Sequence, residues 1–304
     1  MSRQIEGVSI VIPAHNEEKG LKKTLEECAG ALEKLNGIAY EIVVVDDGST
    51  DDTAQIARDA GVVIVSHPSN GGYGFSLKDG INAAKYDAVI ITDADGTYPV
   101  KDIPVLIEQY RKGFDMVVGA RTGANYRQSF LKSVLRRILK FMVEWACGKR
   151  IDDINSGFRI FSKAEAQNYY FHLCDTFSFT TSITLAYMMT GKFVSYIPTE
   201  YYQRDGSSHV RIFRDSIRTI TYVMKQILYF DPLKIFFLFA VAWVSLGVLA
   251  LVLSAVFGLK FGYYVLILSV FGFFVMLGLG LIAEQLRQVI GVEKASQNRD
   301  GQWK

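Results

Sequence analysis

Two pairs of aspartates follow apolar runs, and their type and spacing suggest chemistry. The segment ITDADGTYP, residues 91–99, places Asp93 and Asp95 directly after an apolar run, and EIVVVDDGSTDD ends an earlier run with Asp46 and Asp47. Like charges that converge repel one another unless a cation lies between them. Mg2+ or Mn2+ would resolve this conflict, because such ions take one or two carboxylates and complete their shell with substrate phosphates and water. A solvated acidic turn is the simpler reading of one Asp-x-Asp, but a second acidic pair upstream favours a metal site.

The order of the surrounding elements predicts that both pairs lie at one edge of a sheet. The run GVSIVIPAHNE has the continuous apolar character of a strand that is buried on both faces. Helical and apolar segments then alternate, with helices expected over 17–35, after 49–51 and over 74–84. This order predicts a mostly parallel, doubly wound α/β sheet, in which ligands bind beyond the carboxyl ends of the strands.

Two long apolar runs near the C-terminus predict a membrane anchor. Residues 235–259 and 263–283 contain no charged side chain, and each run is long enough to cross a hydrocarbon core of roughly 30 Å. The short link between them predicts a helical hairpin. Basic residues flank the hairpin on both outer sides, so the positive-inside rule places both termini in the cytoplasm. Two buried core helices of a soluble domain are the alternative.

The remaining composition limits the class of protein. The 304 residues carry a net charge of +2, which by itself is uninformative. The cysteines are widely spaced without a CxxC pair, which indicates reduced thiols in the cytoplasm and neither a disulfide framework nor a zinc site. No cleavable signal peptide is visible. We expect a catalytic domain over 1–210, a basic amphipathic helix over 211–232, two membrane helices within 233–286 and a cytoplasmic tail over 287–304.

Seven segments together resemble a known family. In chain order they are VSIVIPAHNEEKGL, EIVVVDDGSTDDT, NGGYGFSLKDGINAA, ITDADG, DMVVGAR, INSGFRIF and YYQRDGSSHV. They resemble family 2 glycosyltransferases of the GT-A fold, within the subgroup of polyprenyl-phosphate glycosyltransferases. That subgroup includes dolichol-phosphate mannose synthase and bacterial undecaprenyl-phosphate glucosyltransferases with a two-helix C-terminal anchor. The resemblance covers nearly the whole chain and implies the GT-A fold.

The resemblance also implies roles at the donor site. It implies that the nucleotide pocket is framed by Pro13, Asn16 and Glu17, with Asp46 or Asp47 on the base or ribose. Asp93 and Asp95 form the Asp-x-Asp pair of the family, with Asp95 as the first choice for the ligand of Mg2+ or Mn2+. Members often carry Gln two residues later, where this chain has Thr97, so a third protein ligand is in doubt.

A second basic motif of the family lies just before the membrane. The family pattern Arg-x-Gly-x-Ser-Lys reads Arg204-Asp-Gly-Ser-Ser-His209 in this chain. Arg204 is implied to reach the donor diphosphate or the metal, where fixed positive charge stabilises the leaving group. His209 makes the last charge dependent on pH, and an ordinary surface histidine is the alternative.

The candidate for a general base departs from the family pattern. Some relatives carry an Asp just before Phe-Arg, where this chain has Gly157, and Asp153 is the nearest acidic candidate upstream. Asp153 is therefore a candidate catalytic residue; a turn residue or a partner of Arg159 are the alternatives. A lipid monophosphate acceptor is already ionised at pH 7, because its second pKa is about 6, and needs no base.

The segment SFLKSVLRRILKFMVEWACG, residues 129–148, predicts a basic amphipathic helix. Apolar residues recur at three- and four-residue spacing beside a stripe of cations, which suits a membrane surface or a core-facing helix with a charged outer face. Because the lipid phosphate must arrive from the membrane side, we predict an acceptor-phosphate site formed by Arg121, Lys132, Arg136, Arg137 and His209.

The combined reading is an inverting, metal-dependent glycosyltransferase of the cytoplasmic membrane. It would move one sugar from a nucleotide donor, UDP- or GDP-linked, to undecaprenyl or dolichyl phosphate on the cytoplasmic leaflet. The sugar, the base and the lipid stay open. We expect a homo-oligomer, a tetramer by analogy, and no nucleic-acid partner. A dehydrogenase is disfavoured because Leu77 interrupts the glycine fingerprint, and a processive synthase because two spans build no channel. An inactive membrane-anchored nucleotide-sugar-binding scaffold is the remaining alternative.

Overall fold

The computed structural model describes residues 3–33, 37–122, 130–202, 212–258 and 260–301. The chain divides into two compact units, Met1–Val223 and Met224–Lys304. The first unit contains the sheet and the second contains the two long apolar helices, so each is described by itself.

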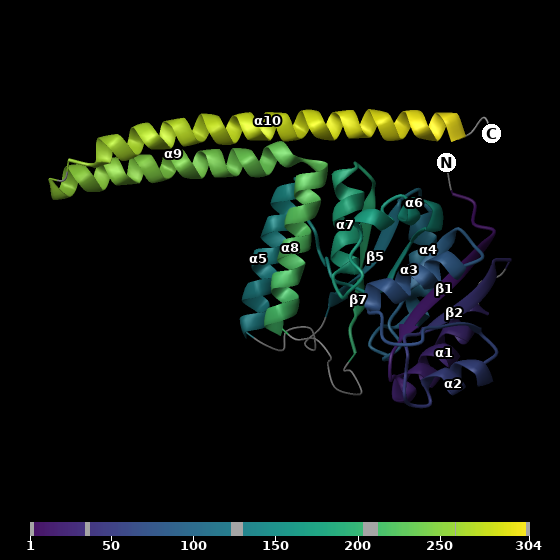
Figure 1. Cartoon of the computed structure of the whole chain (residues 1–304). Helices are drawn as coiled ribbons and strands as arrows, with labels where there is room; N and C mark the ends of the chain where they lie inside the picture. The colour runs from purple at the N-terminus through teal and green to yellow at the C-terminus, as the bar shows by residue number, and fades with distance from the viewer. Residues whose placement is uncertain (1–2, 34–36, 123–129, 203–211, 259, 302–304) are drawn as a thin grey trace. The chain divides into compact units, whose positions relative to one another are not determined.

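A seven-stranded sheet forms the centre of the first unit (Figure 1). Its order is β3-β2-β1-β4-β6-β5-β7, and β6 runs antiparallel to its neighbours β4 and β5 while the other pairs are parallel. The carboxyl ends of all strands except β6 therefore share one edge, and the expected mostly parallel sheet is confirmed. The strands are β1 (Gly7–Ala14), β2 (Ala39–Asp46), β3 (Val63–Ser66), β4 (Ala88–Ile91), β5 (Met116–Thr122), β6 (Arg159–Ser162) and β7 (Val194–Glu200).

Helices cover both faces of this sheet, as a doubly wound fold requires. Alternate residues of β1 serve the two faces: Ile10 packs in the core that includes Leu21 of α1 and Leu106 of α4, whereas Val11 faces Gly80 of α3. A Cβ at position 80 would collide with Val11, so a glycine is required for α3 to lie this close. The helices are α1 (Glu18–Leu32), α2 (Thr53–Asp59), α3 (Tyr73–Ala83), η1 (Val100–Asp102), α4 (Ile103–Arg111), α5 (Phe130–Cys147), α6 (Lys163–Gln167), η3 (Tyr170–His172), α7 (Phe179–Met189) and α8 (Ile212–Phe230).

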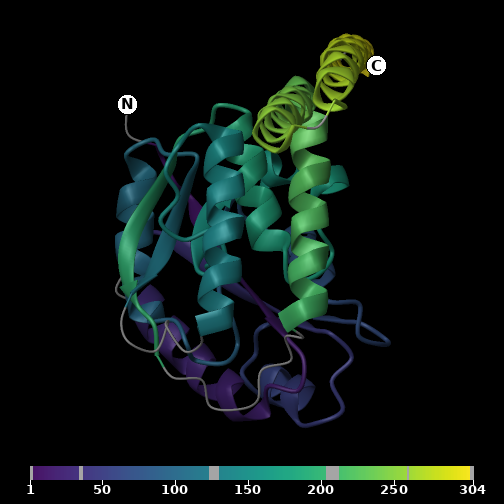
Figure 2. The same cartoon turned by 90° about the vertical axis from the view of Figure 1, so that its left-hand side faces the viewer.

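The second unit is built on two antiparallel helices, α9 (Pro232–Phe257) and α10 (Gly262–Gly301), which lie side by side (Figures 1 and 2). The Asp231 carboxylate caps α9 by accepting from the Lys234 N–H at 3.3 Å. The stretches Pro232–Phe257 and Gly262–Val289 are long and apolar enough to cross a bilayer, and within an apolar 18-residue window of each only 17% and 11% is buried. A soluble core helix would be mostly buried, so the exposure favours membrane helices over that alternative.

Close packing joins α9 to α10. Gly247 lies against Ser269, where an added Cβ would come within 2.6 Å of the serine Cβ, and Gly272 lies against the Trp243 ring. Small residues at these positions let the two backbones approach, as is common between membrane helices. α10 continues past the charge-free run predicted over 263–283, because Glu, Gln, Lys and Arg favour a helix and no proline follows.

Candidate active site

The loops after β1 and β2 form the first part of the carboxyl edge. The register pairs Ala14 with Asp46, so the two strands end together. Asn16 then adopts a left-handed backbone, with a φ of 55°, and its Oδ1 accepts from the Thr50 N–H at 2.8 Å. The Glu17 N–H donates to Thr53 Oγ1 at 2.8 Å. Asn16 and Glu17 thus tie the loops together beside the buried Pro13, and their implied role at the nucleotide pocket stays a prediction.

Asp47 is anchored inside the protein. Its carboxylate accepts from the Gly71 N–H at 2.8 Å and the Gly72 N–H at 2.9 Å, and lies 2.7 Å from His67 Nδ1. Burial alone would raise the pKa of Asp47, but these hydrogen bonds lower it below its ordinary value. The Asp46 carboxylate accepts a hydrogen bond from the Ser49 N–H at 3.0 Å. Of the two aspartates, Asp46 is therefore the better candidate for a contact with the nucleotide.

Asp93 and Asp95 follow β4 at the same edge. Tyr73 donates its hydroxyl to Asp93 Oδ1 at 2.8 Å. Gly157 lies so close that an added Cβ would come within 2.8 and 2.9 Å of the two Asp93 oxygens. Asp95 is 8% exposed, and its Oδ1 accepts from Thr97 twice, from the N–H at 3.1 Å and from Oγ1 at 2.6 Å. Thr97 thus donates to the carboxylate and orients it.

This donor set fits a cation that is shared with a substrate. Within the described ranges, no group of three or more His, Cys, Asp or Glu side chains gathers as a metal cluster. An all-protein cage is therefore not built from these residues. Two hard carboxylates at one edge are instead typical of Mg2+ or Mn2+ sites that rely on phosphate oxygens and water.

Arg121, at the end of β5, pairs with Asp153. Arg121 Nε and Nη2 donate to the carboxylate at 2.7 and 2.9 Å, and the Arg121 and Asn155 N–H groups each donate at 3.1 Å. Burial alone would raise the pKa of Asp153, but Arg121 holds it below its ordinary value. The guanidinium also lies 5.5 Å from the centre of the Tyr201 ring. Among the described residues, Arg121 and not Arg159 forms the direct ion pair with Asp153.

Arg159 is fully buried and shapes the loop between Asp153 and Gly157. It donates to the Ser156 carbonyl at 3.0 Å, to the Thr180 carbonyl at 3.1 Å and to Thr184 Oγ1 at 2.8 Å. Among the ion pairs of the described ranges, none includes Arg159, and burial lowers the pKa of its guanidinium. An arginine inside the apolar run FRIF was the sequence signal for this buried role.

Tyrosines at the site were missed by the sequence reasoning. Tyr98, which follows the acidic motif, accepts from the Gly157 N–H through its hydroxyl at 2.8 Å. Tyr201 lies edge-on to the Tyr98 ring with centroids 5.4 Å apart, and the Tyr202 N–H donates to the Thr97 carbonyl at 2.9 Å. A tyrosine in an apolar segment reads as core, so only its position directly beside an acidic or glycine motif could have marked it.

The remaining predicted residues are only partly described. Arg204 and His209 lie outside the described residues. The helix predicted over 129–148 is confirmed as α5, which carries Lys132, Arg136 and Arg137, and the Arg137 side chain is exposed. Among the α5 side chains whose burial is described, Val143 and Ala146 are buried.

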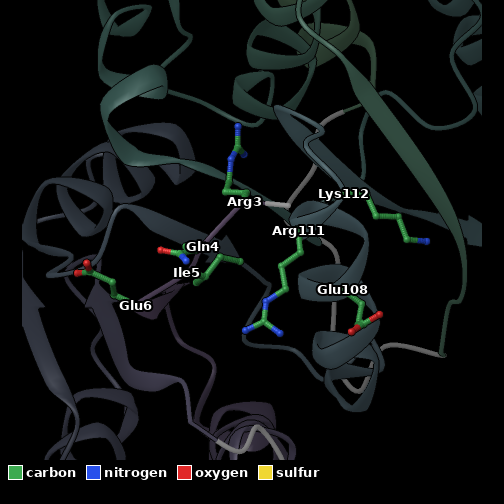
Figure 3. Close-up of a pocket in the computed structure, with 7 residues that line it drawn as sticks. All are labelled: Arg3, Gln4, Ile5, Glu6, Glu108, Arg111 and Lys112. Carbon is green, nitrogen blue, oxygen red and sulfur yellow. The ribbon is translucent and has the colours of Figure 1, made fainter. Parts of the chain in front are cut away.

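A separate hollow lies away from this edge (Figure 3). Its volume is about 600 Å3, and it opens beside the segment before β1 and the end of α4, at the amino-terminal side of the sheet. Arg3 in its wall is held by the Phe114 carbonyl at 2.9 Å and by Asp115 at 3.7 Å. The aspartates of the two acidic motifs end or follow β2 and β4 and do not line this hollow. The carboxyl edge of the sheet is therefore the candidate site. The hollow is lined by Arg3, Gln4, Ile5, Glu6, Glu108, Arg111 and Lys112.

Comparisons with known proteins agree with this geometry. The family described as "Glycosyl transferase family 2" matches residues 9–174. Undecaprenyl-phosphate 4-deoxy-4-formamido-L-arabinose transferase of Yersinia pestis is 28% identical over 99% of this chain and 98% of that protein. The enzyme of the same name from Serratia proteamaculans is 33% identical over 52% of this chain and 50% of that protein.

Solved structures share the fold. Glucosyl-3-phosphoglycerate synthase from Mycobacterium tuberculosis, in complex with Mn2+, UDP and glucosyl-3-phosphoglycerate, superposes with a TM-score of 0.59 at 19% identity. The match covers 73% of this chain and 80% of the synthase. The same enzyme in complex with phosphoglyceric acid gives a TM-score of 0.61 at the same identity and coverage. These similarities show a GT-A-type fold.

Proposed function

Since the chain belongs to glycosyl transferase family 2, we propose that this glycosyltransferase moves one sugar from a nucleotide donor to a polyprenyl phosphate at a membrane. Relatives named for undecaprenyl phosphate align over 99% of the chain, so the similarity includes the two apolar helices. These helices are long and apolar enough to cross a membrane, which supports a lipid acceptor. We further propose the cytoplasmic leaflet as the place of reaction, with both termini in the cytoplasm.

The absence of a base at Gly157 carries the choice of acceptor. Gly157 has no side chain, so this chain offers no base at the position where some relatives carry a carboxylate, and the Asp93 oxygens lie beside that glycine instead. Asp153 is bound by Arg121 through two hydrogen bonds from its guanidinium. A hydroxyl acceptor would need a general base, whereas a phosphate monoester arrives ionised. The geometry of these residues thus favours a phosphate acceptor.

The donor side is proposed around Asp95. Mg2+ or Mn2+ on Asp95, with Asp93 beside it, would supply a Lewis acid for the leaving diphosphate. Thr97 orients the Asp95 carboxylate through two hydrogen bonds. We propose Arg204 as a further cation for the diphosphate and Asp46 as the contact to the base or ribose. The Mn2+ and UDP named for the solved synthase structure support the choice of metal and of a nucleoside diphosphate.

The acceptor side is proposed around Arg121. Because Asp153 holds its Nε and Nη2 in fixed directions, the guanidinium is positioned before any ligand arrives. Further cations would come from Lys132, Arg136 and Arg137 on α5 and from His209. A phosphate that approaches this edge would then meet several positive charges. We retain a homo-oligomer, a tetramer by analogy, as part of the proposal.

The test is a transfer assay with the full-length protein in detergent. UDP-, GDP- and CDP-sugars with a labelled sugar are each incubated with a short polyprenyl phosphate and Mn2+ or Mg2+. We expect one donor to give a labelled lipid product that EDTA abolishes. Asp95→Asn should lose transfer by several orders of magnitude without a change in melting temperature. Nucleotide-sugar binding without transfer by the wild type would instead support the inactive scaffold.

A further inference from the structure

The segment Gly71–Tyr73 contacts both acidic motifs of the site. The N–H groups of Gly71 and Gly72 donate to the two oxygens of Asp47 at 2.8 and 2.9 Å. The next residue, Tyr73, begins α3 and donates its hydroxyl to Asp93 at 2.8 Å. Three consecutive residues therefore join the carboxylate after β2 to the carboxylate after β4.

The backbone of this segment has little freedom. Gly72 has a φ of 104°, a conformation that side chains rarely adopt, and an added Cβ would come within 2.9 Å of the Asp175 carbonyl. The Phe75 N–H donates to that same carbonyl at 3.0 Å. The loop that contains Asp175 is in turn fixed to α3 by Lys78, whose ammonium lies 2.6 Å from the Asp175 carboxylate. Tyr73 thus starts from a fixed backbone position.

The Tyr73 ring is also held in place. It stacks on Phe177, with centroids 5.8 Å apart and planes 18° from parallel. Its hydroxyl lies where a Cβ on Gly157 would approach to 3.0 Å, so the phenol oxygen lies beside both that glycine and Asp93. The hydroxyl therefore has one defined direction, which is toward the Asp93 carboxylate.

We propose that Tyr73 is a positioning residue that orients the Asp93 carboxylate for the divalent cation. The segment Gly71–Tyr73 would thereby hold the carboxylates of Asp47 and Asp93 in fixed positions relative to each other. This inference rests on the proposed function. A hydrogen bond from a neighbour orients a ligating carboxylate and tunes its affinity for a metal, and loss of such a neighbour typically costs about 10- to 100-fold in metal affinity or activity. Tyr73 acts through Asp93 and contacts no reacting atom in this scheme.

The variant Tyr73→Phe tests the proposal because it keeps the stacked ring and removes only the hydroxyl. Mn2+ binding is measured by the electron paramagnetic resonance signal of free Mn2+, with full-length protein in detergent, first without nucleotide and then with UDP or GDP. We expect Mn2+ affinity to fall about 10- to 100-fold, with kcat falling in the same direction. The matched control is Tyr40→Phe, which removes the same hydroxyl from an exposed tyrosine on β2 and should change neither quantity.

A double-variant comparison separates positioning from general stability. In an Asp93→Asn background, Tyr73→Phe should add little further loss of Mn2+ affinity, because both changes break one interaction. Additive losses, or a lower melting temperature with unchanged Mn2+ affinity, would overturn the proposal. The proposed function is tested by a different result: it is wrong if the wild type transfers no sugar to polyprenyl phosphate. Mn2+ titrations without an active donor still test Tyr73 in that case.

Discussion

Replacement of Asp153 by Asn decides whether this residue is a base or a support for Arg121. The two carboxylate oxygens accept four hydrogen bonds, three from Arg121 and one from the Asn155 N–H. An amide offers one accepting oxygen, so its NH2 group would face two donors in either orientation. Asp153→Asn therefore removes the ion pair with Arg121. It also places an NH2 group against two of the four N–H donors, so two hydrogen bonds are lost.

The size of the effect follows from burial. The side chains are 2% exposed for Asp153 and 15% exposed for Arg121, so the guanidinium would lose its partner in a largely dry environment. Removal of one partner of a buried pair costs about 3–5 kcal/mol. We expect about 3 kcal/mol, because the amide keeps one acceptor, which corresponds to a melting temperature lower by roughly 6–12 °C in a domain of this size.

The stabilisation that the Asp153–Arg121 pair contributes depends on pH with a definite sign. The folded state holds the pKa of Asp153 below its ordinary value. The stabilisation is therefore fully present above the unfolded pKa of about 3.9 and is lost as pH falls through the folded pKa. The difference in melting temperature between wild type and Asp153→Asn should stay constant from about pH 5 to 8 and shrink below about pH 4.

Thermal unfolding of the detergent-solubilised full chain, followed by near-UV circular dichroism, gives the stability. Steady-state kinetics between pH 6 and 9 gives kcat. Asp152→Asn is the matched control, because it makes the same change at an exposed neighbour and should leave both unchanged. An unchanged melting temperature together with a large loss of kcat would show that Asp153 is a base and refute the reasoning.

Three further predictions concern the lipid, the topology and the thiols. Arg136→Ala and Arg137→Ala, singly and together, should raise the KM for polyprenyl phosphate well above any change in the nucleotide-sugar KM; an unchanged acceptor KM in all three variants would reduce α5 to packing or membrane association. In intact cells an impermeant maleimide should label Lys260→Cys, in the turn between the spans, and should reach Cys147 only after permeabilisation. In the folded protein Ellman's reagent should react with the half-buried Cys147 and spare Cys28, because burial raises the pKa of the Cys28 thiol to about 12; rapid native labelling of Cys28 would contradict its place in the core.

The fold was largely predictable because apolar runs and acidic turns repeat in a βαβ order. The run that became β1 is buried throughout, as its continuous apolar character indicated. The antiparallel strand β6 was not anticipated. Its sequence, beginning at Arg159, is short, and its direction depends on pairing with β4 and β5 across long stretches of chain. Such long-range pairing leaves no local sequence pattern.

The positions of the carboxylates were more predictable than their partners. Asp93 and Asp95 were identified from their place at the end of an apolar run and from a second acidic pair upstream; the structure confirms that they follow β4, and their role at a metal stays a prediction. The pairing of Asp153 with Arg121 was not, because the two residues come from different elements and many cations were equally available. Tyr73 was also missed, since nothing in its local sequence reveals that its hydroxyl reaches Asp93.

The glycine contacts between α9 and α10 bear on where the chain tolerates shortening. A chain cut after Gly258 would keep α9 but lose Ser269 and Gly272, which pack against Gly247 and Trp243. The gap left by the missing side chain of Gly247 would then face lipid. Lipid tails fill such a gap less well than the packed side chains of α10 do. A chain that ends before Asp231 removes the capping residue and both spans at once. The hairpin is therefore a single module, and we expect shortened forms to tolerate its complete removal better than the loss of α10 alone.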